Sequence, residues 1–204
     1  MHRTHLTSAR TRGRRLLLAM ALFAAPWLAM ADQGAEWNLS TLMQALAQHQ
    51  SGRASFVDTK TMAMLDAPIA SSGELRFAAP DFLEMRTLKP KPQTIILLAN
   101  QLTVELGGRS HQLNLDDHPD IAVLVNSILA TLNGDLNLLQ RDYLVGLSGD
   151  AARWTLNLVP VDPRARQRVR AIRIEGRQGQ VRSIAVLQTD GDHSLMTIRE
   201  RTDP

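Results

Sequence analysis

The sequence predicts a mainly β protein of the α+β class, with one antiparallel sheet and three helices. Short segments with alternating apolar residues recur along most of the chain, separated by Gly, Pro, Asn and Asp. Two segments instead carry apolar residues at helical spacing, near residues 39–46 and 117–132. About eleven consecutive strands are too many for a flat sheet, so we expect the sheet to curl into an incomplete barrel with the helices on its concave side.

The first thirty-one residues have the composition of an export signal. Arginines between Arg3 and Arg15 precede an apolar run over residues 16–28, and Ala29-Met30-Ala31 offers the small residues that a signal peptidase reads. The apolar run is too short to span a bilayer comfortably. We therefore expect cleavage after Ala31, a single domain over residues 32–204 and a location in the periplasm.

Removal of residues 1–31 changes the sign of the net charge. The full chain has 23 basic and 20 acidic residues. The expected signal holds five arginines and no acid, which leaves 18 basic against 20 acidic residues, a net charge of −2. We therefore expect no nucleic-acid partner. One basic run remains at residues 164–177, which is either a solvated loop and strand face or a docking patch for an acidic partner or anionic headgroups.

The chain contains no cysteine. This excludes disulfides and thiolate chemistry, so the stability of the fold must come from burial. Residues 32–204 are enough for one domain with one core, and we expect a monomer.

The elements predicted for the first half are one helix and a series of strands. Leu39, Leu42, Met43 and Leu46 form a helical stripe that ends before Ser51-Gly52. From Ala54 the apolar period changes to two, which predicts a long strand as far as Leu65, bulged near its middle. Further strands are predicted at residues 74–77, 82–88, 94–98, 102–106 and 110–115, with a tight turn at 107–108.

The second half begins with the longest predicted helix, at residues 117–132. Pro119 suits its first turn, Asp120 suits its positive dipole end, and Asn133-Gly134 stops it. Asp135 caps a short third helix that runs to Tyr143. The remaining strands are predicted at residues 144–147, 154–159, 169–175, 181–187 and 194–199.

The sequence shows no common catalytic or metal-binding pattern. It lacks an H-E-x-x-H motif and a phosphate-binding glycine loop, and the residues around Ser148 lack the spacing of a nucleophile elbow. Asp116, Asp117 and His118 precede the long helix and fit helix-start residues better than metal ligands. We expect no catalytic residue, no metal and no cofactor, and rank an ester hydrolase built from distant residues last.

Aliphatic residues dominate the predicted strand faces. An ordinary core explains any one of them, but Met62, Met64 and Met85 fall on adjacent predicted strands and Met43 lies on the first helix. Flexible thioether side chains suit a cavity that adapts to acyl chains of variable shape. The sequence therefore favours a protein that holds a lipid over one that cuts a substrate.

The order of motifs resembles a known family. ASFVDT opens a long strand, GELRF and PDF follow, and WTLNLVP and TDGDHS come after a mid-chain helix. Behind a cleavable signal and a short amphipathic helix, this order resembles the LolA-like family of periplasmic outer-membrane lipoprotein carriers. The resemblance implies an incomplete antiparallel β-barrel covered by helices and enclosing a hydrophobic cavity. It also implies acylated cargo, an inner-membrane transporter or exporter as donor, and an outer-membrane acceptor.

The sequence departs from the family pattern in two places. Ala78-Ala79 stand before Pro80, where the family has a basic pair whose arginine latches the lid. Family aromatic positions in the strand meander are replaced by residues such as Leu97 and Val104. We therefore expect a divergent LolA-related branch, whose cargo is a lipoprotein or another acylated envelope lipid such as a glycolipid or polyene lipid.

We expect strand residues to line the cavity and residues of the long helix to close it. The predicted lining residues are Phe56, Met64, Leu75, Phe77, Met85, Ile95, Leu97, Ile172, Ile174, Ile184 and Val186, closed by Leu124, Ile128 and Leu129. The predicted function is a carrier that shields acyl chains between the inner and outer membranes. The alternative is a lipid-sensing interaction module on the same fold, supported by the arginine run at residues 164–177.

Overall fold

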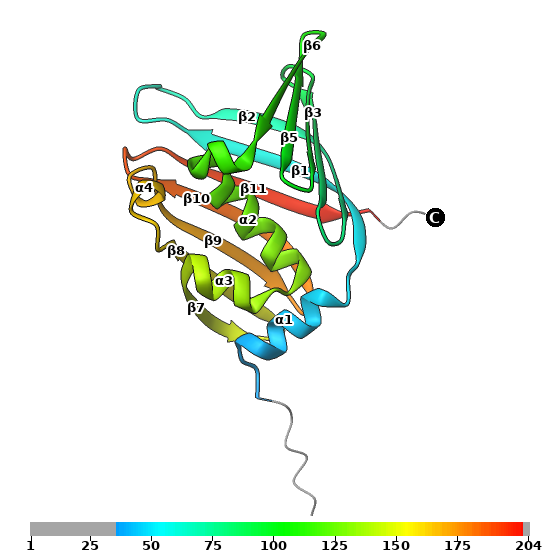
Figure 1. Cartoon of the computed structure of the whole chain (residues 1–204), viewed down its shortest axis with the longest axis vertical. Helices are drawn as coiled ribbons and strands as arrows, with labels where there is room; N and C mark the ends of the chain where they lie inside the picture. Colours follow the sequence, from blue (N-terminus) through cyan, green and yellow to red (C-terminus); the bar gives the residue numbers. More distant parts are fainter. Residues whose placement is uncertain (1–35, 202–204) are drawn as a thin grey trace, which may run out of the picture. The chain divides into compact units, whose positions relative to one another are not determined.

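The computed structural model describes residues 36–201, so the expected signal and its cleavage at Ala31 lie outside the described residues. An antiparallel sheet of eleven strands forms the body of the domain, in the order β6-β5-β4-β3-β2-β1-β11-β10-β9-β8-β7 (Figure 1). Strands β6 and β7 are its two edges, so the sheet stays open. The expected class, a mainly β incomplete barrel with helices, is confirmed.

The first six strands form a consecutive meander that follows helix α1 (Leu39–Ala47). Their bounds are β1 (Ser51–Thr61), β2 (Ile69–Ala78), β3 (Phe82–Lys89), β4 (Gln93–Leu98), β5 (Gln101–Leu106) and β6 (Arg109–Asn114). Strand β1 ends at Thr61, four residues earlier than the sequence predicted. The Asp192 carboxylate accepts a hydrogen bond from the Ala63 N–H at 2.9 Å, which holds the following loop without strand pairing.

The chain then places its helices on one face of the sheet (Figure 1). They are the 3-10 turn η1 (Leu115–Asp117), α2 (Pro119–Asn133) and α3 (Leu136–Asp142). Gly134 ends α2 at φ +66°, in the left-handed region that glycine adopts without strain. A Cβ at this position would lie 2.2 Å from the Met43 carbonyl oxygen, so the glycine also permits the close approach of α1 to α2.

The last five strands form a second meander that returns to the first. Their bounds are β7 (Tyr143–Asp150), β8 (Arg153–Pro160), β9 (Val169–Arg177), β10 (Gln180–Gln188) and β11 (His193–Glu200). Strand β11 pairs with β1, which joins the two halves of the sheet. A fourth helix, α4 (Pro163–Arg166), was not predicted, because four residues are too few to show an apolar period. Tyr143 begins β7 and is not part of the third helix.

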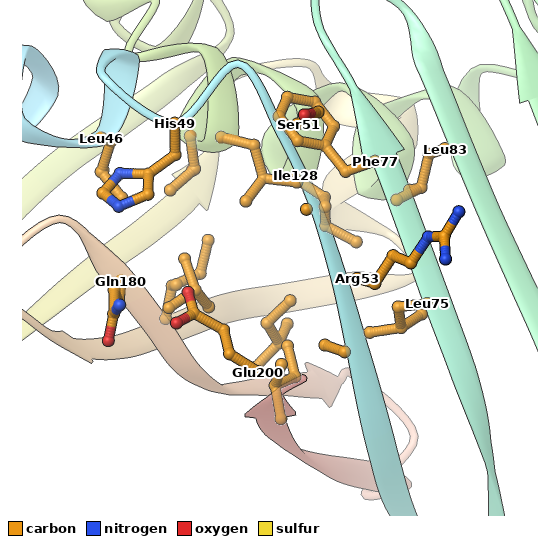
Figure 2. Close-up of a pocket in the computed structure, with 18 of the residues that line it drawn as sticks. Leu46, His49, Ser51, Arg53, Leu75, Phe77, Leu83, Ile128, Gln180 and Glu200 are labelled. Carbon is orange, nitrogen blue, oxygen red and sulfur yellow. The ribbon is translucent and has the colours of Figure 1, made fainter. Parts of the chain in front are cut away.

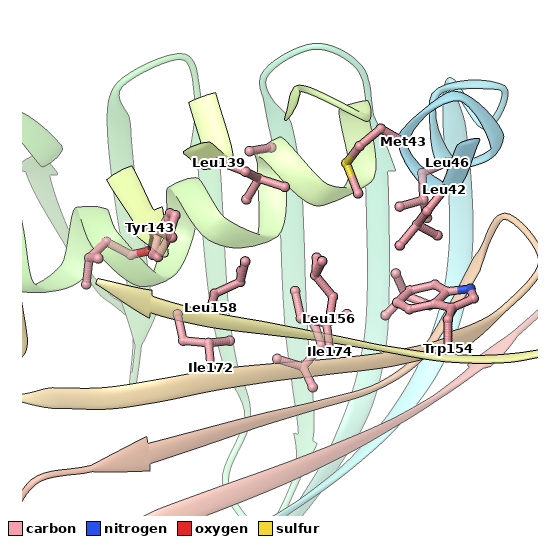
Figure 3. Close-up of a cluster of buried hydrophobic side chains, with 14 of the residues drawn as sticks. Leu42, Met43, Leu46, Leu139, Tyr143, Trp154, Leu156, Leu158, Ile172 and Ile174 are labelled. Carbon is pink, nitrogen blue, oxygen red and sulfur yellow. Dashed lines mark hydrogen bonds between the residues drawn. The ribbon is translucent and has the colours of Figure 1, made fainter. Parts of the chain in front are cut away.

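Two clusters of buried apolar side chains lie between the helices and the sheet. The larger one, which we call the C-terminal cluster, joins the four α-helices α1 to α4 to strands β7 to β10 (Figure 3). The smaller one, the N-terminal cluster, joins α2 to strands β4 and β5 through Leu97, Leu102, Leu115 and Leu129. Helix α2 contributes to both, so it links the two halves of the sheet from their concave side.

Trp154 belongs to the C-terminal cluster and lies at its α1 end (Figure 3). Its side chain is fully buried, and its indole N–H donates a hydrogen bond to the Gln178 carbonyl oxygen at 2.7 Å. Gly176 makes room for the ring, because a Cβ on Gly176 would lie 2.1 Å from Trp154 Cζ2 and 2.3 Å from the Gln180 carbonyl oxygen. Any side chain at this position must therefore displace the tryptophan or the β9–β10 hairpin.

We expect Gly176→Ala to lower the free energy of unfolding by about 2–3 kcal/mol, because it overpacks the ring. Gly146→Ala in β7 is the matched control, since a Cβ there meets nothing within 4 Å. Urea denaturation followed by tryptophan fluorescence measures both. Equal stability of the two variants would contradict the packing role of Gly176.

Tyr143 fastens α2 to the start of β7. Its buried hydroxyl donates a hydrogen bond to the Val123 carbonyl oxygen. Burial, reinforced by the charge of Asp142, raises the pKa of the Tyr143 phenol well above its usual range. The folded protein therefore binds this proton more tightly than the unfolded chain does, and the resulting stability is present below pH ~10 and declines as the pH rises above it.

Tyr143 is the only tyrosine of the chain, so its ionisation can be followed directly by tyrosinate absorbance. We expect the folded protein to ionise at a higher pH than the urea-unfolded chain, which should titrate near pH ~10. Tyr143→Phe should lose less stability than the unmodified protein between pH ~9.5 and ~11.5. Identical titration curves for the folded and unfolded chains would rule out the buried hydrogen bond.

Candidate functional site

An apolar cavity of about 170 Å³ lies beneath α2 and between the two halves of the sheet (Figure 2). Strands β1, β2 and β3 form one wall, β9, β10 and β11 form the other, and α1 and α2 cover it. The apolar lining residues are Leu46, Ala54, Leu75, Phe77, Leu83, Met85, Ile128, Leu132, Ile174, Val181, Ile184, Met196 and Ile198.

Strand register explains why these side chains share one face. Ala54 on β1 pairs with Leu75 on β2, and Leu75 pairs with Met85 on β3. In the other direction Ile198 on β11 pairs with Phe56, two residues along β1 from Ala54. Because directly paired residues lie on the same side of a sheet, the apolar residues of six strands converge on the cavity.

Six of the residues predicted to line the cavity do so, and they are Leu75, Phe77, Met85, Ile128, Ile174 and Ile184. Seven others lie in the core around it. Phe56 is buried beside Gly73. The N-terminal cluster contains Ile95, Leu97 and Leu129, and the C-terminal cluster contains Leu124, Ile172 and Val186. These seven residues pack in the core around the cavity instead of lining it.

The predicted position of Met64 in the cavity wall is wrong. This residue was expected on a strand beside Met85, but β1 has ended before it and its side chain is 92% exposed in the β1–β2 loop. Met62 lies in the same loop, so the predicted methionine cluster does not form. Instead Met196, which alternates with Leu195 and Thr197 along β11, brings a thioether to the cavity.

One end of the cavity is polar. His49, Ser51, Arg53, Gln180 and Glu200 line it, and Figure 2 shows His49, Gln180 and Glu200 around the apolar interior. These positions were missed because no motif marks them: the pairing of Ala54 with Glu200 brings together residues from opposite ends of the chain. A cavity with an apolar interior and polar end suits an amphiphile whose apolar part enters and whose polar part stays at that end.

The size of the cavity limits what it holds in this conformation. A cavity of about 150 Å³ lined by aliphatic and aromatic residues is large enough for benzene. At about 170 Å³ the present cavity therefore accepts a short length of acyl chain but not a complete one. A longer chain needs either an outward shift of α2 or an extension past the polar end.

The C-terminal end of α2 is fastened to the β2–β3 turn. The Asn133 side-chain amide donates a hydrogen bond to the Pro80 carbonyl oxygen at 2.6 Å. Ala78-Ala79 stand at this turn, where the family resemblance implies a basic pair. The other Asn133 side-chain atom, Oδ1, is buried without a hydrogen-bond partner, which makes this fastening weaker than a fully satisfied one.

Two polar side chains on the buried side of α2 need no partner on the sheet. The Thr131 hydroxyl donates to the Ser127 carbonyl oxygen and the Ser127 hydroxyl donates to the Leu124 carbonyl oxygen, each at 2.7 Å. Because both bonds stay within the helix, a movement of α2 does not break them. Apolar contacts, the bond from Tyr143 and the bond from Asn133 hold the helix in place.

Within residues 36–201, no three His, Asp or Glu side chains gather closely enough to bind a metal ion. None of the helices within that range combines the length and apolar character needed to cross a bilayer.

Comparison with protein families identifies the chain. The model of the family described as outer membrane lipoprotein carrier protein LolA-like matches residues 31–199. The chain belongs to this LolA-like family. A comparison with curated proteins finds no match. The family resemblance predicted from the order of motifs is thus confirmed over almost the whole described domain.

Solved structures that match most of the chain do so at low sequence identity, as three of them show. A LolA superfamily protein from Nitrosomonas europaea is 12% identical, with a TM-score of 0.46 over 83% of this chain and 96% of that one. A DUF1329 family protein from Desulfovibrio piger is 13% identical, with a TM-score of 0.49 over 81% and 90% of the two chains. In a MucA/MucB complex from Pseudomonas aeruginosa, one chain is 16% identical, with a TM-score of 0.45 over 81% of this chain and 58% of that one.

We expect Asn133→Ala to loosen the end of α2 in this LolA-like protein. Loss of one hydrogen bond should increase amide hydrogen exchange at residues 130–133 about fivefold, which corresponds to about 1 kcal/mol. Asn126→Ala, on the same helix, is the control and should leave exchange at these residues unchanged. If both variants exchange at the same rate as the unmodified protein, Asn133 does not fasten the helix.

Proposed function

We propose that the protein is a periplasmic carrier that shields the acyl chains of a lipoprotein or another acylated envelope lipid. The observation that carries the proposal is the apolar cavity beneath α2, formed by strands from both halves of the sheet. Membership of a lipoprotein-carrier family supports it. Cleavage after Ala31 and export by the N-terminal signal are parts of the same proposal.

The energetics of an acyl chain make a shielded cavity necessary. Each methylene buried from water contributes about 0.8 kcal/mol, so a sixteen-carbon chain represents on the order of 12 kcal/mol. A soluble carrier must supply most of this burial and must then release the lipid. A cavity that is small when closed, beneath a helix held mainly by apolar contacts, fits both needs because acyl groups can replace those contacts as the helix shifts.

The proposed route runs from the inner membrane to the outer membrane. The carrier receives its cargo from an inner-membrane transporter or exporter and delivers it to an outer-membrane acceptor. The cavity recognises acyl groups rather than a particular headgroup, since its interior is lined by Leu, Ile, Val, Met, Phe and Ala. Both lipoproteins and acylated glycolipids or polyene lipids are therefore within the proposed cargo range.

The test is binding of a fluorescent sixteen-carbon fatty-acid probe to the domain comprising residues 32–204. Ala54→Leu adds bulk inside the cavity and should weaken probe binding at least tenfold. Ala185→Leu is the matched control, because Ala185 lies on the opposite face of the sheet. The affinity of this variant for the probe should be within twofold of that of the unmodified protein. Unfolding curves check that both variants fold.

Native mass spectrometry of the purified domain complements the probe assay by showing whether lipid is retained from the cell. Absence of retained lipid together with absence of probe binding would refute the carrier proposal. Equal binding by Ala54→Leu and Ala185→Leu would show that the probe binds elsewhere.

A further inference from the structure

The outer face of the sheet, opposite the helices, is strongly basic. Strand register places arginines there from β8 across to β3, since Arg53 pairs with Arg76, and Arg199 pairs with Ser55. Across these seven strands and the residue after β11, the exposed arginines on this outer face are Arg53, Arg76, Arg86, Arg153, Arg170, Arg173, Arg177, Arg199 and Arg201. Within the described strands of this face, three acidic residues accompany them, namely Glu74, Glu84 and Glu175, and Asp192 of the β10–β11 turn lies beside Arg170 and Arg173.

Ion pairs within the face neutralise part of this charge. Arg201 pairs with Glu74 at 2.5 Å, and Arg76 pairs with Glu84 at 3.2 Å. Glu175 lies beside Ser183, whose hydroxyl is 3.4 Å from its carboxylate. A net positive charge remains over a surface roughly 30 Å wide, as expected for seven strands about 4.8 Å apart.

Three of the helical elements, η1, α2 and α3, have the opposite charge, whereas α4, which packs against α2, carries Arg164 and Arg166. Residues 115–142, which form η1, α2 and α3, contain Asp116, Asp117, Asp120, Asp135 and Asp142 against a single Arg141. The domain is therefore electrically polarised, although its basic and acidic residues nearly balance. A negatively charged surface attracts the outer face of the sheet and repels the helices, which fixes the orientation of approach.

The outer face also exposes aliphatic side chains among the arginines. Val57 on β1 is 53% exposed and Leu195 on the neighbouring β11 is 47% exposed. A shallow groove on the same face is lined by Leu195 and Leu187 together with Arg170 and Arg173. Arginines around exposed aliphatic groups are typical of a surface that meets phosphate headgroups and the adjoining acyl boundary.

We propose that the outer face of the sheet docks the domain on an anionic phospholipid membrane surface. The basic charge is spread over a width of seven strands, six of which carry at least one of these arginines, instead of being concentrated in one cleft, which fits a plane of phosphates better than a single acidic peptide. Arginine guanidinium groups bind phosphate through two parallel hydrogen bonds, and the basic residues named on this face are all arginines. Docking in this orientation leaves α2 facing away from the membrane.

The arginine run at residues 164–177 acquires a specific role in this proposal. Its second half lies on β9, where Arg170, Arg173 and Arg177 join the outer face. Its first half lies on α4 and the following loop, at one end of the same strands. The proposal goes beyond acyl-chain transport, because a domain with an empty cavity would dock equally well.

The test is co-sedimentation of residues 32–204, which include the compact unit at residues 35–204, with lipid vesicles. We expect binding to phosphatidylcholine vesicles that contain about 30% phosphatidylglycerol, weaker binding as salt rises from ~0.1 M to ~0.5 M, and no binding to phosphatidylcholine alone. The variant Arg86→Gln, Arg170→Gln and Arg199→Gln should bind at least tenfold more weakly. Omission of residues 1–31 removes a separate apolar segment that would itself bind lipid.

The control removes the same amount of charge from elsewhere, as Lys91→Gln, Arg109→Gln and Arg141→Gln. It should bind anionic vesicles within twofold of the unmodified domain. Equal loss in both triple variants, or equal binding to neutral and anionic vesicles, would overturn the proposal. So would binding to soluble polyglutamate without binding to anionic vesicles, which would assign the face to an acidic protein.

Loading with the fatty-acid probe is measured on the same preparations. Vesicle docking without probe binding would support the proposed membrane surface and refute the carrier function. Probe binding without vesicle docking would support the carrier function and refute the proposed membrane surface.

Discussion

The packing of α2 against both halves of the sheet is the interaction on which the rest of the structure depends. One side of this helix completes the C-terminal cluster and another completes the N-terminal cluster. The two meanders meet only through the pairing of β1 with β11, so the helix determines how far they close toward each other. The cavity is the space that the helix leaves unfilled between them. A shift of α2 therefore changes cavity size, sheet curvature and burial together.

The unequal size of the two clusters indicates which contacts give way first. The C-terminal cluster joins four helices to four strands and includes Trp154 and Tyr143, whereas the N-terminal cluster has four buried residues at its centre. An incoming acyl chain offers α2 the same kind of apolar contact that it loses from Leu97 and Leu102. The hydrogen bonds of Ser127 and Thr131 stay within the helix, so a shift of α2 leaves these two hydroxyls paired, whereas the bonds from Asn133 and Tyr143 resist the shift.

Sequence patterns predicted the fold class, most element bounds and six of the residues that line the cavity, because alternation and helical spacing are local properties. They did not predict where Met64 would lie, since an apolar alternation continues past Thr61 although the strand ends there. The polar end of the cavity was also missed, because His49, Gln180 and Glu200 meet only through the pairing of distant strands. The sequence showed part of the basic outer face as the arginine run at residues 164–177. Only the strand order shows that arginines of this run share a face with Arg53, Arg86 and Arg199.

The pairing of β1 with β11 has a consequence for how the domain is made. Ser55 and Arg199 are neighbours in the sheet but are separated by 144 residues along the chain. Each meander can form from contacts between successive strands, which is fast, while the central pairing must close the longest loop of the domain. A chain that emerges from its N-terminus during synthesis or export therefore exposes the unpaired edge of β1 until the last strand arrives. Such an edge is a template for pairing with another chain, so this interval is the one in which a holding chaperone would protect the protein most.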